Sequence, residues 1–200
     1  MNRRPEFEND QNWHNRGYLP HYDAAYKYQM ITYRLADSLP QKFLQDLGAR
    51  ASCPQSQIEV RVKTEELLDK GYGSCLLKES ACAKIVIDAW QYFDGQRYDL
   101  LAYVVMPNHI HVLIKTYESY SLSDIIHSWK SFTSNKIQTH LKSAGKMPTL
   151  PAIWQQEYWD RFIRDEKHFA SSINYILDNP VKAGLVKESK DWPWSYCKFK

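Results

Sequence analysis

The sequence predicts an α+β fold in which helices pack on an antiparallel sheet. Segments rich in aromatic and β-branched residues alternate with segments of helical periodicity. Two apolar segments, 98–106 and 109–115, are separated only by the turn signal Pro107-Asn108, which indicates a hairpin. Aromatic residues make up 14% of the 200 residues and the net charge is only +3, which argues against a disordered chain.

The first half of the chain predicts one strand and several helical segments. Residues 1–22 lack clear periodicity and are expected to form an arm, followed by a single domain over 23–200. A strand is expected over 28–35, before a Ser-Leu-Pro breaker. A short helix and loop are expected over 40–54, and helices over 59–70 and 76–93, separated by Gly-Tyr-Gly. The segment from about 39 to 80 is a candidate helical insert.

The second half predicts the hairpin, two longer helices and a further short strand. Ser121 and Asp124 resemble a capping box that opens a helix running to about Leu141. A loop over 145–151 precedes a short strand or hairpin within 154–163. The last long helix is expected from Asp165 to about Asn179, with Pro180 marking its end or a break into a turn. Residues 192–194 are expected to lie in a C-terminal coil.

Composition excludes several classes of protein. Mean hydropathy is −0.59, and no apolar run approaches the roughly 20 residues that a membrane span needs. Residues 1–10 are polar and carry no targeting signal. The four cysteines, at positions 53, 75, 82 and 197, form no C-x-x-C pair, so a zinc site built on thiolates is not expected. We expect reduced thiols in a cytoplasmic protein with no membrane partner.

His109-Ile110-His111 is the first candidate for chemistry. Side chains of a strand alternate between faces, so the two imidazoles point the same way while Ile110 points into apolar surroundings. Two imidazoles on one face can form half of a metal site. The alternative is a pair of strand histidines at a solvent face, and the spacing alone leaves both interpretations open.

Tyr175 and Asn179 form the second candidate. They are four residues apart in the last long helix and share a face beside its apolar stripe. A hydroxyl and an amide at that border can meet a cleft. The alternative is that the tyrosine is packing and that the asparagine before proline is a cap.

An acid-free window is the third candidate. Between Asp124 and Glu157 there is no acidic residue, whereas four lysines occur, at positions 130, 136, 142 and 146, and Arg161 and Arg164 follow closely. A locally positive surface with aromatic neighbours suits phosphate contacts and base stacking on single strands. An ordinary solvated lysine face is the alternative.

The three candidates combine into one chemistry. A phenolic oxygen can attack a phosphodiester and hold the 5′ phosphate covalently. A divalent metal on two histidines and an amide oxygen would polarise the scissile phosphate. A positive groove lined by aromatic residues would position the strand.

Two segments carry a family resemblance. Residues 103–113, Tyr-Val-Val-Met-Pro-Asn-His-Ile-His-Val-Leu, closely resemble the His-hydrophobic-His (HUH) motif of single-tyrosine transposases. Residues 175–185, Tyr-Ile-Leu-Asp-Asn-Pro-Val-Lys-Ala-Gly-Leu, resemble the tyrosine helix of the transposases associated with repetitive extragenic palindromes (REP). The stretch 154–164 and the ending Trp-Pro-Trp-Ser at 192–195 are similar to that family too.

The resemblance implies a fold, a site and a substrate. The fold is a central antiparallel sheet flanked by helices, of the ferredoxin-like HUH type. Tyr175 is implied as the nucleophile, and His109, His111 and Asn179 as ligands of Mg²⁺ or Mn²⁺. The implied substrate is single-stranded DNA beside a REP-like hairpin, which is cut to a 5′-phosphotyrosine and a free 3′-OH and then rejoined by a monomer or homodimer. Such a protein would be nucleoid-associated when bound to DNA.

The DNA contacts and the alternatives remain expectations. Candidate DNA-binding residues are Lys130, Lys136, Arg161 and Arg164, with Arg16 and Tyr18 from the arm. A relaxase or replication-initiator nuclease shares the two-histidine motif, but the chain carries no helicase-like segment. A domesticated, non-catalytic hairpin binder is the other alternative, and the intact set of site residues argues against it.

Overall fold

The central element is a five-stranded antiparallel sheet with strand order β6-β3-β5-β4-β7. The computed structural model describes residues 13–15, 20–22, 26–43, 54–146 and 152–199. The strands are β3 (Tyr28–Arg34), β4 (Tyr98–Val105), β5 (His109–Thr116), β6 (Trp159–Phe162) and β7 (Ser195–Cys197). This sheet with its helices confirms the α+β prediction.

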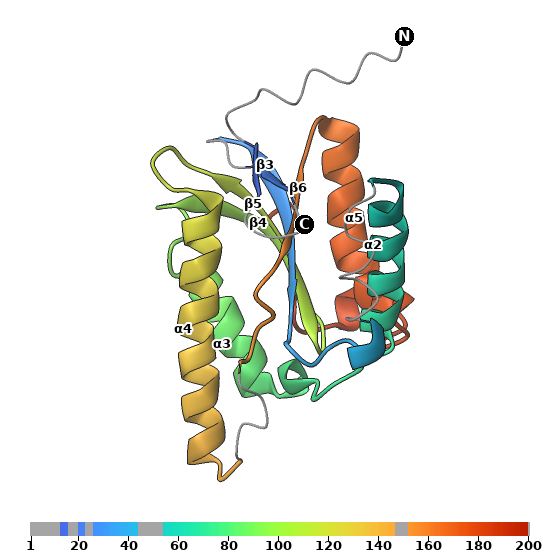
Figure 1. Ribbon diagram of the computed structural model, residues 1–200. Helices are drawn as coiled ribbons and strands as arrows, with labels where there is room; N and C mark the ends of the chain where they lie inside the picture. The colour runs from blue at the N-terminus through green and yellow to red at the C-terminus, as the bar shows by residue number, and fades with distance from the viewer. Residues whose placement is uncertain (1–12, 16–19, 23–25, 44–53, 147–151, 200) are drawn as a thin grey trace.

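Helices cover both faces of the sheet (Figure 1). On one face lie α3 (Ser80–Gln91) and α4 (Leu122–Ser143), and on the other lie α2 (Pro54–Asp69) and α5 (Glu166–Lys182). Single turns of 3₁₀ helix occur at Leu76–Lys78 and Ser189–Asp191. Because neighbouring residues of a strand face opposite sides, Ile110 and Val112 join the core under α3 and α4, whereas Leu113 joins the core under α5.

β5 is the middle strand, and its neighbours determine what surrounds its histidines. It pairs with β4 through the predicted hairpin, with Val105 opposite Ile110, and with β3 on its other side. In that second ladder Thr32 lies opposite His111 and Arg34 opposite His109. The pairing therefore brings a residue of the first long strand beside each histidine.

A buried aromatic network fixes α3 and α4 on the sheet. The Trp129 indole donates to the Tyr98 hydroxyl (2.9 Å), which donates to the Trp90 carbonyl (2.6 Å). The Trp90 indole donates in turn to the Tyr33 hydroxyl (3.1 Å). Each of these indole and hydroxyl groups has a hydrogen-bond partner inside the core, so large aromatic side chains are buried there with their polar atoms paired.

The last helix continues through Pro180, contrary to our expectation that this proline ends it or breaks it into a turn. The helix ends instead in a Schellman motif around Gly184, whose φ is +69°. The amide of Gly184 donates to the Val181 carbonyl and that of Leu185 to the Pro180 carbonyl, both at 2.9 Å. The left-handed glycine therefore provides the stop signal.

Short strands that the sequence did not predict lie near both ends of the chain. Residues 195–197, just after the expected coil, form edge strand β7 on β4. In the expected arm, β1 (Trp13–Asn15) pairs with β2 (Pro20–Tyr22) in a two-stranded ladder.

Within the segment 154–163, where a short strand or hairpin was expected, residues 159–162 form a strand, and Trp154 makes an isolated bridge to Leu35.

Two expectations concern the helices. Residues 41–43 are helical, and most of the expected 40–54 helix and loop lies outside the described residues. Within the described part of the chain, no helix combines the length and apolarity needed to cross a membrane.

Candidate functional site

The two imidazoles of β5 lie on the sheet face that α5 covers. His109 and His111 are 2% and 1% exposed, and their ring centroids are 4.9 Å apart. The expected alternation therefore holds, but the histidine face is enclosed rather than solvated. This burial argues against the alternative of a solvent-facing pair.

Hydrogen bonds to Nδ1 orient both rings. The Asn108 amide donates to the backbone carbonyls of Leu68 (3.2 Å) and Tyr72 (3.1 Å), which leaves its oxygen as the acceptor 2.8 Å from His109 Nδ1. His109 therefore carries its proton on Nδ1 and keeps a lone pair on Nε2. His111 Nδ1 lies 2.7 Å from the Thr32 hydroxyl, so Nδ1 of each ring contacts a neighbouring side chain.

Burial also keeps both rings neutral. It lowers the pKa of His109 to about 3. Burial, together with the neighbouring His109, lowers the pKa of His111 well below its ordinary value. A neutral imidazole is the form that binds a metal ion, because the ligand nitrogen must be unprotonated.

Asn179 reaches this pair from α5. Its side chain is 3% exposed, and its Nδ2 lies 3.3 Å from His111 Nε2. Its Oδ1 is buried and has no hydrogen-bond partner among the described residues. An amide flip, which exchanges Oδ1 and Nδ2, would place Oδ1 beside His111 Nε2. The lone pairs of these two atoms would then be directed at the same position. A buried acceptor without a donor fits a cation bound between these groups.

Tyr175 lies one helical turn before Asn179 and contacts the same histidine. Its ring meets the His111 ring edge-to-face at 5.1 Å, and the Lys182 ammonium lies 5.0 Å from the Tyr175 ring centroid. Burial, then the charges of Glu65 and Asp69, raises the pKa of Tyr175 well above its ordinary value. The hydroxyl is therefore held as a phenol.

The fold thus brings together the four residues expected from sequence, namely His109, His111, Tyr175 and Asn179. Sequence reasoning missed Thr32 and Glu65, and it assigned Asn108 only to a turn. No local pattern marks Thr32 or Glu65, because Thr32 contacts His111 from β3 and the charge of Glu65 acts on Tyr175 from α2. A Pro-Asn turn directly before the histidine pair was the one available signal for Asn108.

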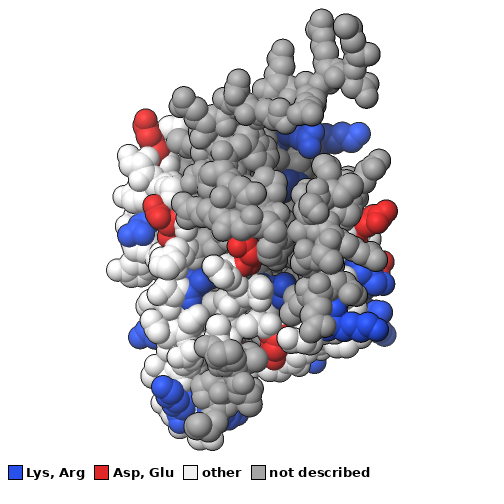
Figure 2. Space-filling model, in the orientation of Figure 1, with Lys and Arg blue, Asp and Glu red and all other residues white. Residues whose placement is uncertain are grey.

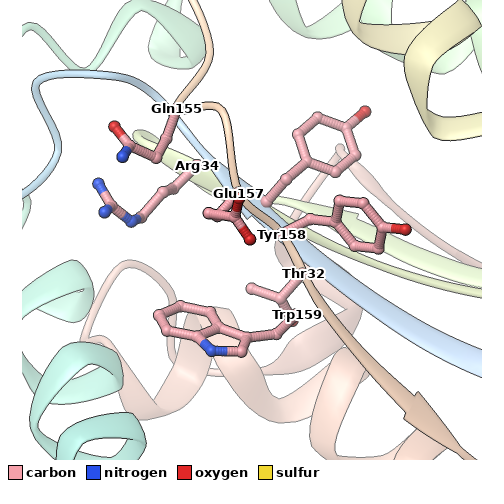
Figure 3. Close-up of a pocket in the computed structure, with 7 residues that line it drawn as sticks. Thr32, Arg34, Gln155, Glu157, Tyr158 and Trp159 are labelled. Carbon is pink, nitrogen blue, oxygen red and sulfur yellow. The ribbon is translucent and has the colours of Figure 1, made fainter. Parts of the chain in front are cut away.

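A small pocket lies beside Thr32, where the chain enters β6 (Figure 3). Thr32 and Trp159 are neighbours there, whereas Tyr158 points to the other side of the strand. Arg34 and Gln155 lie at the opposite end of the pocket. The pocket therefore connects the surroundings of His111 to the segment that resembles the transposase family at 154–164.

The residues expected to contact DNA differ in how far they are exposed. Lys130 lines a larger cavity of about 510 Å³ between α4 and residues 152–158, on the other face of the sheet. Its ammonium donates to the Gln156 carbonyl (2.8 Å) and lies 5.8 Å from the Tyr33 ring centroid. Burial lowers its pKa to about 8. Lys130 is thus engaged with the protein, unlike an extended surface lysine.

The other candidates are exposed or fall outside the described residues. Lys136, Arg161 and Arg164 are exposed, whereas Arg16 and Tyr18 lie outside the described part of the chain. On the face in Figure 2, positive and negative side chains are interspersed. Lys146 from the acid-free window forms an ion pair with Glu79 (2.8 Å). DNA binding by the exposed residues stays a prediction.

A second group of metal-binding residue types lies away from the histidine pair. Donor atoms of Glu79, Cys82 and His140 lie within 4.8 Å of one another. His140 Nε2 is 2.6 Å from the Glu79 carboxylate, whose other oxygen accepts from Lys146. Sequence analysis of the cysteines did not find this group, because its members come from α4, α3 and the residue before α3. The contacts with Lys146 and His140 already satisfy the Glu79 carboxylate.

Comparison with known proteins matches the part of the chain that contains the candidate site. The sequence matches a family model described as "Transposase IS200 like" over residues 79–179, which is half of the chain and includes all four site residues. It is 33% identical over 110 residues to a putative REP-associated tyrosine transposase of Haemophilus influenzae, covering 49% of this chain and 58% of the relative. It is 35% identical over 98 residues to a REP-associated tyrosine transposase of Escherichia coli, covering 49% and 53%.

The matched region spans about half the length of these curated relatives. Among solved structures, one of a REP-associated tyrosine transposase bound to a REP hairpin superposes with a TM-score of 0.52 at 21% identity. That superposition covers 88% of this chain and 79% of the other. At this identity, the likeness shows a shared fold.

Proposed function

The chain belongs to the IS200-like transposase family, and from this premise we propose that it cuts and rejoins single-stranded DNA beside a hairpin through Tyr175. One observation carries the proposal. A buried pair of neutral imidazoles, an amide oxygen without a donor and a phenol meet at one place on the sheet. Nothing in the packing of the sheet requires such a group of polar side chains, and this reaction uses each of them.

Tyr175 acts as the nucleophile in the proposed cleavage. Its Oη attacks the phosphorus of the scissile phosphodiester, an O–P bond to tyrosine forms and the bond to the 3′ oxygen breaks. The phenol loses its proton, and the departing 3′ oxygen takes up one. The products are a 5′-phosphotyrosine and a free 3′-OH. Attack by another 3′-OH reverses the step and joins new strands, so the covalent link conserves the energy of the broken bond.

His109, His111 and Asn179 would hold a divalent cation. Two neutral imidazoles and an amide oxygen form a mixed donor set that Mn²⁺ accepts, and Mg²⁺ is the other candidate. When bound, the ion supplies charge stabilisation for the phosphate oxygens. The hydrogen bonds of His109 with Asn108 and of His111 with Thr32 keep the ring nitrogens oriented, and burial excludes the water that would compete for them.

The partner is a single-stranded DNA hairpin of the REP type. Support comes from the solved transposase whose bound ligand is a REP hairpin and which shares this fold. Exposed Lys136, Arg161 and Arg164 are the described residues that we assign to phosphate contacts.

Covalent trapping tests the proposal. The protein is incubated with Mn²⁺ and a panel of labelled single-stranded hairpins, and adducts are resolved on a denaturing gel. We expect a protein–DNA adduct with the wild type and none with Tyr175→Phe. Tyr92→Phe is the matched control, because Tyr92 is 71% exposed. An adduct with Tyr175→Phe would refute the assignment of the nucleophile.

A second variant separates chemistry from binding. His109→Ala should abolish cleavage while leaving hairpin affinity nearly unchanged, because metal and strand contacts are separate. Equal loss of both would indicate that His109 is structural. Hairpin binding without cleavage by the wild type, on every hairpin of the panel, would instead favour the non-catalytic hairpin binder.

A further inference from the structure

Two helices on the sheet face away from Tyr175 bring together three side chains that the proposed function does not use. Helix α3 packs against α4 there (Figure 1). Glu79 precedes the first residue of α3, Cys82 lies in its first turn, and His140 lies in the last turn of α4. One carboxylate oxygen, the thiol sulfur and one imidazole nitrogen lie within 4.8 Å of one another. These are three of the atom types that bind zinc in proteins.

The start of α3 directs two of these side chains towards α4. Glu79 is the N-cap residue, and the Cys82 amide donates to its backbone carbonyl (2.9 Å). An N-cap side chain ordinarily accepts from the free amides of the first turn. The Glu79 carboxylate makes no such hydrogen bond and contacts His140 instead. Cys82, three residues further on, lies on the same side of the helix and faces the same imidazole.

The Cys82 thiol is a buried polar group that the protein leaves unbonded. Its side chain is 0% exposed and is not part of a disulfide. Among the described residues, none forms a hydrogen bond with its Sγ. The Cys75 thiol, by contrast, donates to the Gly71 carbonyl (3.2 Å). A buried sulfur that faces a carboxylate and an imidazole, and is bonded to neither, fits an ion held between the three groups.

The contacts of Glu79 leave room for such an ion. His140 Nε2 lies 2.6 Å from Oε1, and the Lys146 ammonium lies 2.8 Å from Oε2. Each carboxylate oxygen has two lone pairs, so an ion can replace the proton between Nε2 and Oε1 while Lys146 keeps Oε2. The side chains of His140 and Glu79 are 32% and 30% exposed, so the ion can enter from solvent and keep a water ligand.

Distances and donor types both favour Zn²⁺. Tetrahedral zinc, with bonds of about 2.0–2.3 Å, places its ligand atoms about 3.3–3.8 Å apart. The observed separations run from 2.6 Å to at most 4.8 Å and so bracket this spacing. Side-chain movements of about 1 Å are enough to reach it. Thiolate and imidazole donors suit Zn²⁺, whereas Mg²⁺ prefers oxygen donors.

We propose that Glu79 Oε1, Cys82 Sγ and His140 Nε2 bind a Zn²⁺ ion that links the start of α3 to the last turn of α4. As the S–Zn bond forms, the S–H bond breaks and its proton passes to solvent. The imidazole binds through the Nε2 lone pair and carries its proton on Nδ1. The site is separate from the histidine pair of β5 and does not depend on the proposed function.

Cobalt is the probe, because Co²⁺ occupies zinc sites and its bond to a thiolate gives a charge-transfer absorption in the near ultraviolet. The histidine pair of β5 contains no sulfur and cannot produce this absorption. Full-length protein in a phosphine reductant is titrated with Co²⁺ and then with Zn²⁺. We expect the absorption to appear with Co²⁺, to disappear on addition of Zn²⁺ and to persist in excess Mg²⁺. His109→Ala should retain it, since His109 belongs to the other site.

Matched variants assign the ligands. Cys82→Ser should abolish the absorption, and Cys197→Ser, at another buried cysteine, should leave it unchanged. Loss of a group that only supports a ligand already weakens metal binding by about 10–100-fold, so His140→Gln and Glu79→Gln should each raise the Kd of Co²⁺ by about 10-fold or more. His127→Gln, at an exposed histidine of the same helix, should match the wild type. Near-ultraviolet circular dichroism checks that each variant is folded.

A stability measurement completes the test. In the His109→Ala background, Zn²⁺ should raise Tm, and adding Cys82→Ser should remove that rise. The inference is overturned if the folded wild type shows no sulfur absorption at saturating Co²⁺, or if the absorption survives in Cys82→Ser. It is also overturned if His140→Gln and Glu79→Gln both bind Co²⁺ as tightly as the wild type. Because Glu79 is partly exposed, its variant tests the site even if Cys82→Ser does not fold.

Discussion

Replacing Asn108 with alanine should destabilise the fold more than any surface substitution, because this one buried side chain makes three hydrogen bonds, two of them fully buried. They join its amide to the carbonyls of Leu68 and Tyr72 and its oxygen to His109 Nδ1. The residue is 0% exposed, so water does not replace the lost partner of the Leu68 carbonyl or of His109 Nδ1, whereas the Tyr72 carbonyl is only partly buried. Each net hydrogen bond contributes about 1 kcal/mol, and an unsatisfied buried group costs about 1–3 kcal/mol. We therefore expect a loss of about 3–5 kcal/mol in the free energy of unfolding.

Urea unfolding followed by tryptophan fluorescence measures this loss. For a chain of this size, each kcal/mol lowers Tm by about 2–4 °C, so Tm should fall by about 10 °C. Asn135→Ala is the matched control, because Asn135 is exposed on α4 and its replacement should change stability by less than about 0.5 kcal/mol. Hydrogen exchange should also accelerate in the last turn of α2, since Asn108 holds it. A loss below about 1 kcal/mol would refute the reasoning.

Three other predictions concern stability. Burial lowers the pKa of Lys130 from its ordinary 10.5 to about 8, so the unfolded chain holds more protons there between these values. The unfolding free energy of the wild type minus that of Lys130→Met should therefore rise from about pH 8 to 10.5, and a flat difference contradicts this. Tyr98→Phe leaves the buried Trp129 indole without its acceptor and should cost about 1–3 kcal/mol in urea unfolding, with the exposed Tyr92→Phe near zero. Mn²⁺ at about 100 times its Kd should stabilise the wild type by about 2.7 kcal/mol and Asn179→Leu by much less, and equal shifts in Tm would argue against Asn179 as a ligand.

Local sequence patterns predicted correctly those features of the fold whose cause lies within a few residues of the chain. Ser121 begins α4 as expected, since its hydroxyl accepts from the Asp124 amide three residues later. The alternation of a strand placed His109 and His111 on one face, and helical spacing placed Tyr175 and Asn179 on one side of α5. The family resemblance rested on these same segments, and the family match over 79–179 confirmed it.

Local patterns failed where another segment decides the outcome. Residues 195–197 carry too few alternating side chains to predict a strand, yet the free edge of β4 pairs with them. Pro180 was predicted to end the last helix because it lacks an amide proton. The helix ends instead at the hydrogen-bonded turn around Gly184. Lys130 was predicted to be a surface cation, but its side chain packs towards Gln156 and Tyr158.

The sequence by itself determined the chemistry available to this protein: two histidines on one strand face, and a tyrosine and an asparagine one helical turn apart. These relations follow from the periodicity of strands and helices, which depends only on the spacing of residues along the chain. Only the tertiary structure decided that His111 meets Asn179 and Tyr175, and that Asn108 and Thr32 orient the rings. Those contacts join segments far apart in the chain. They depend on strand register and on the docking of α2 and α5, which no local period encodes.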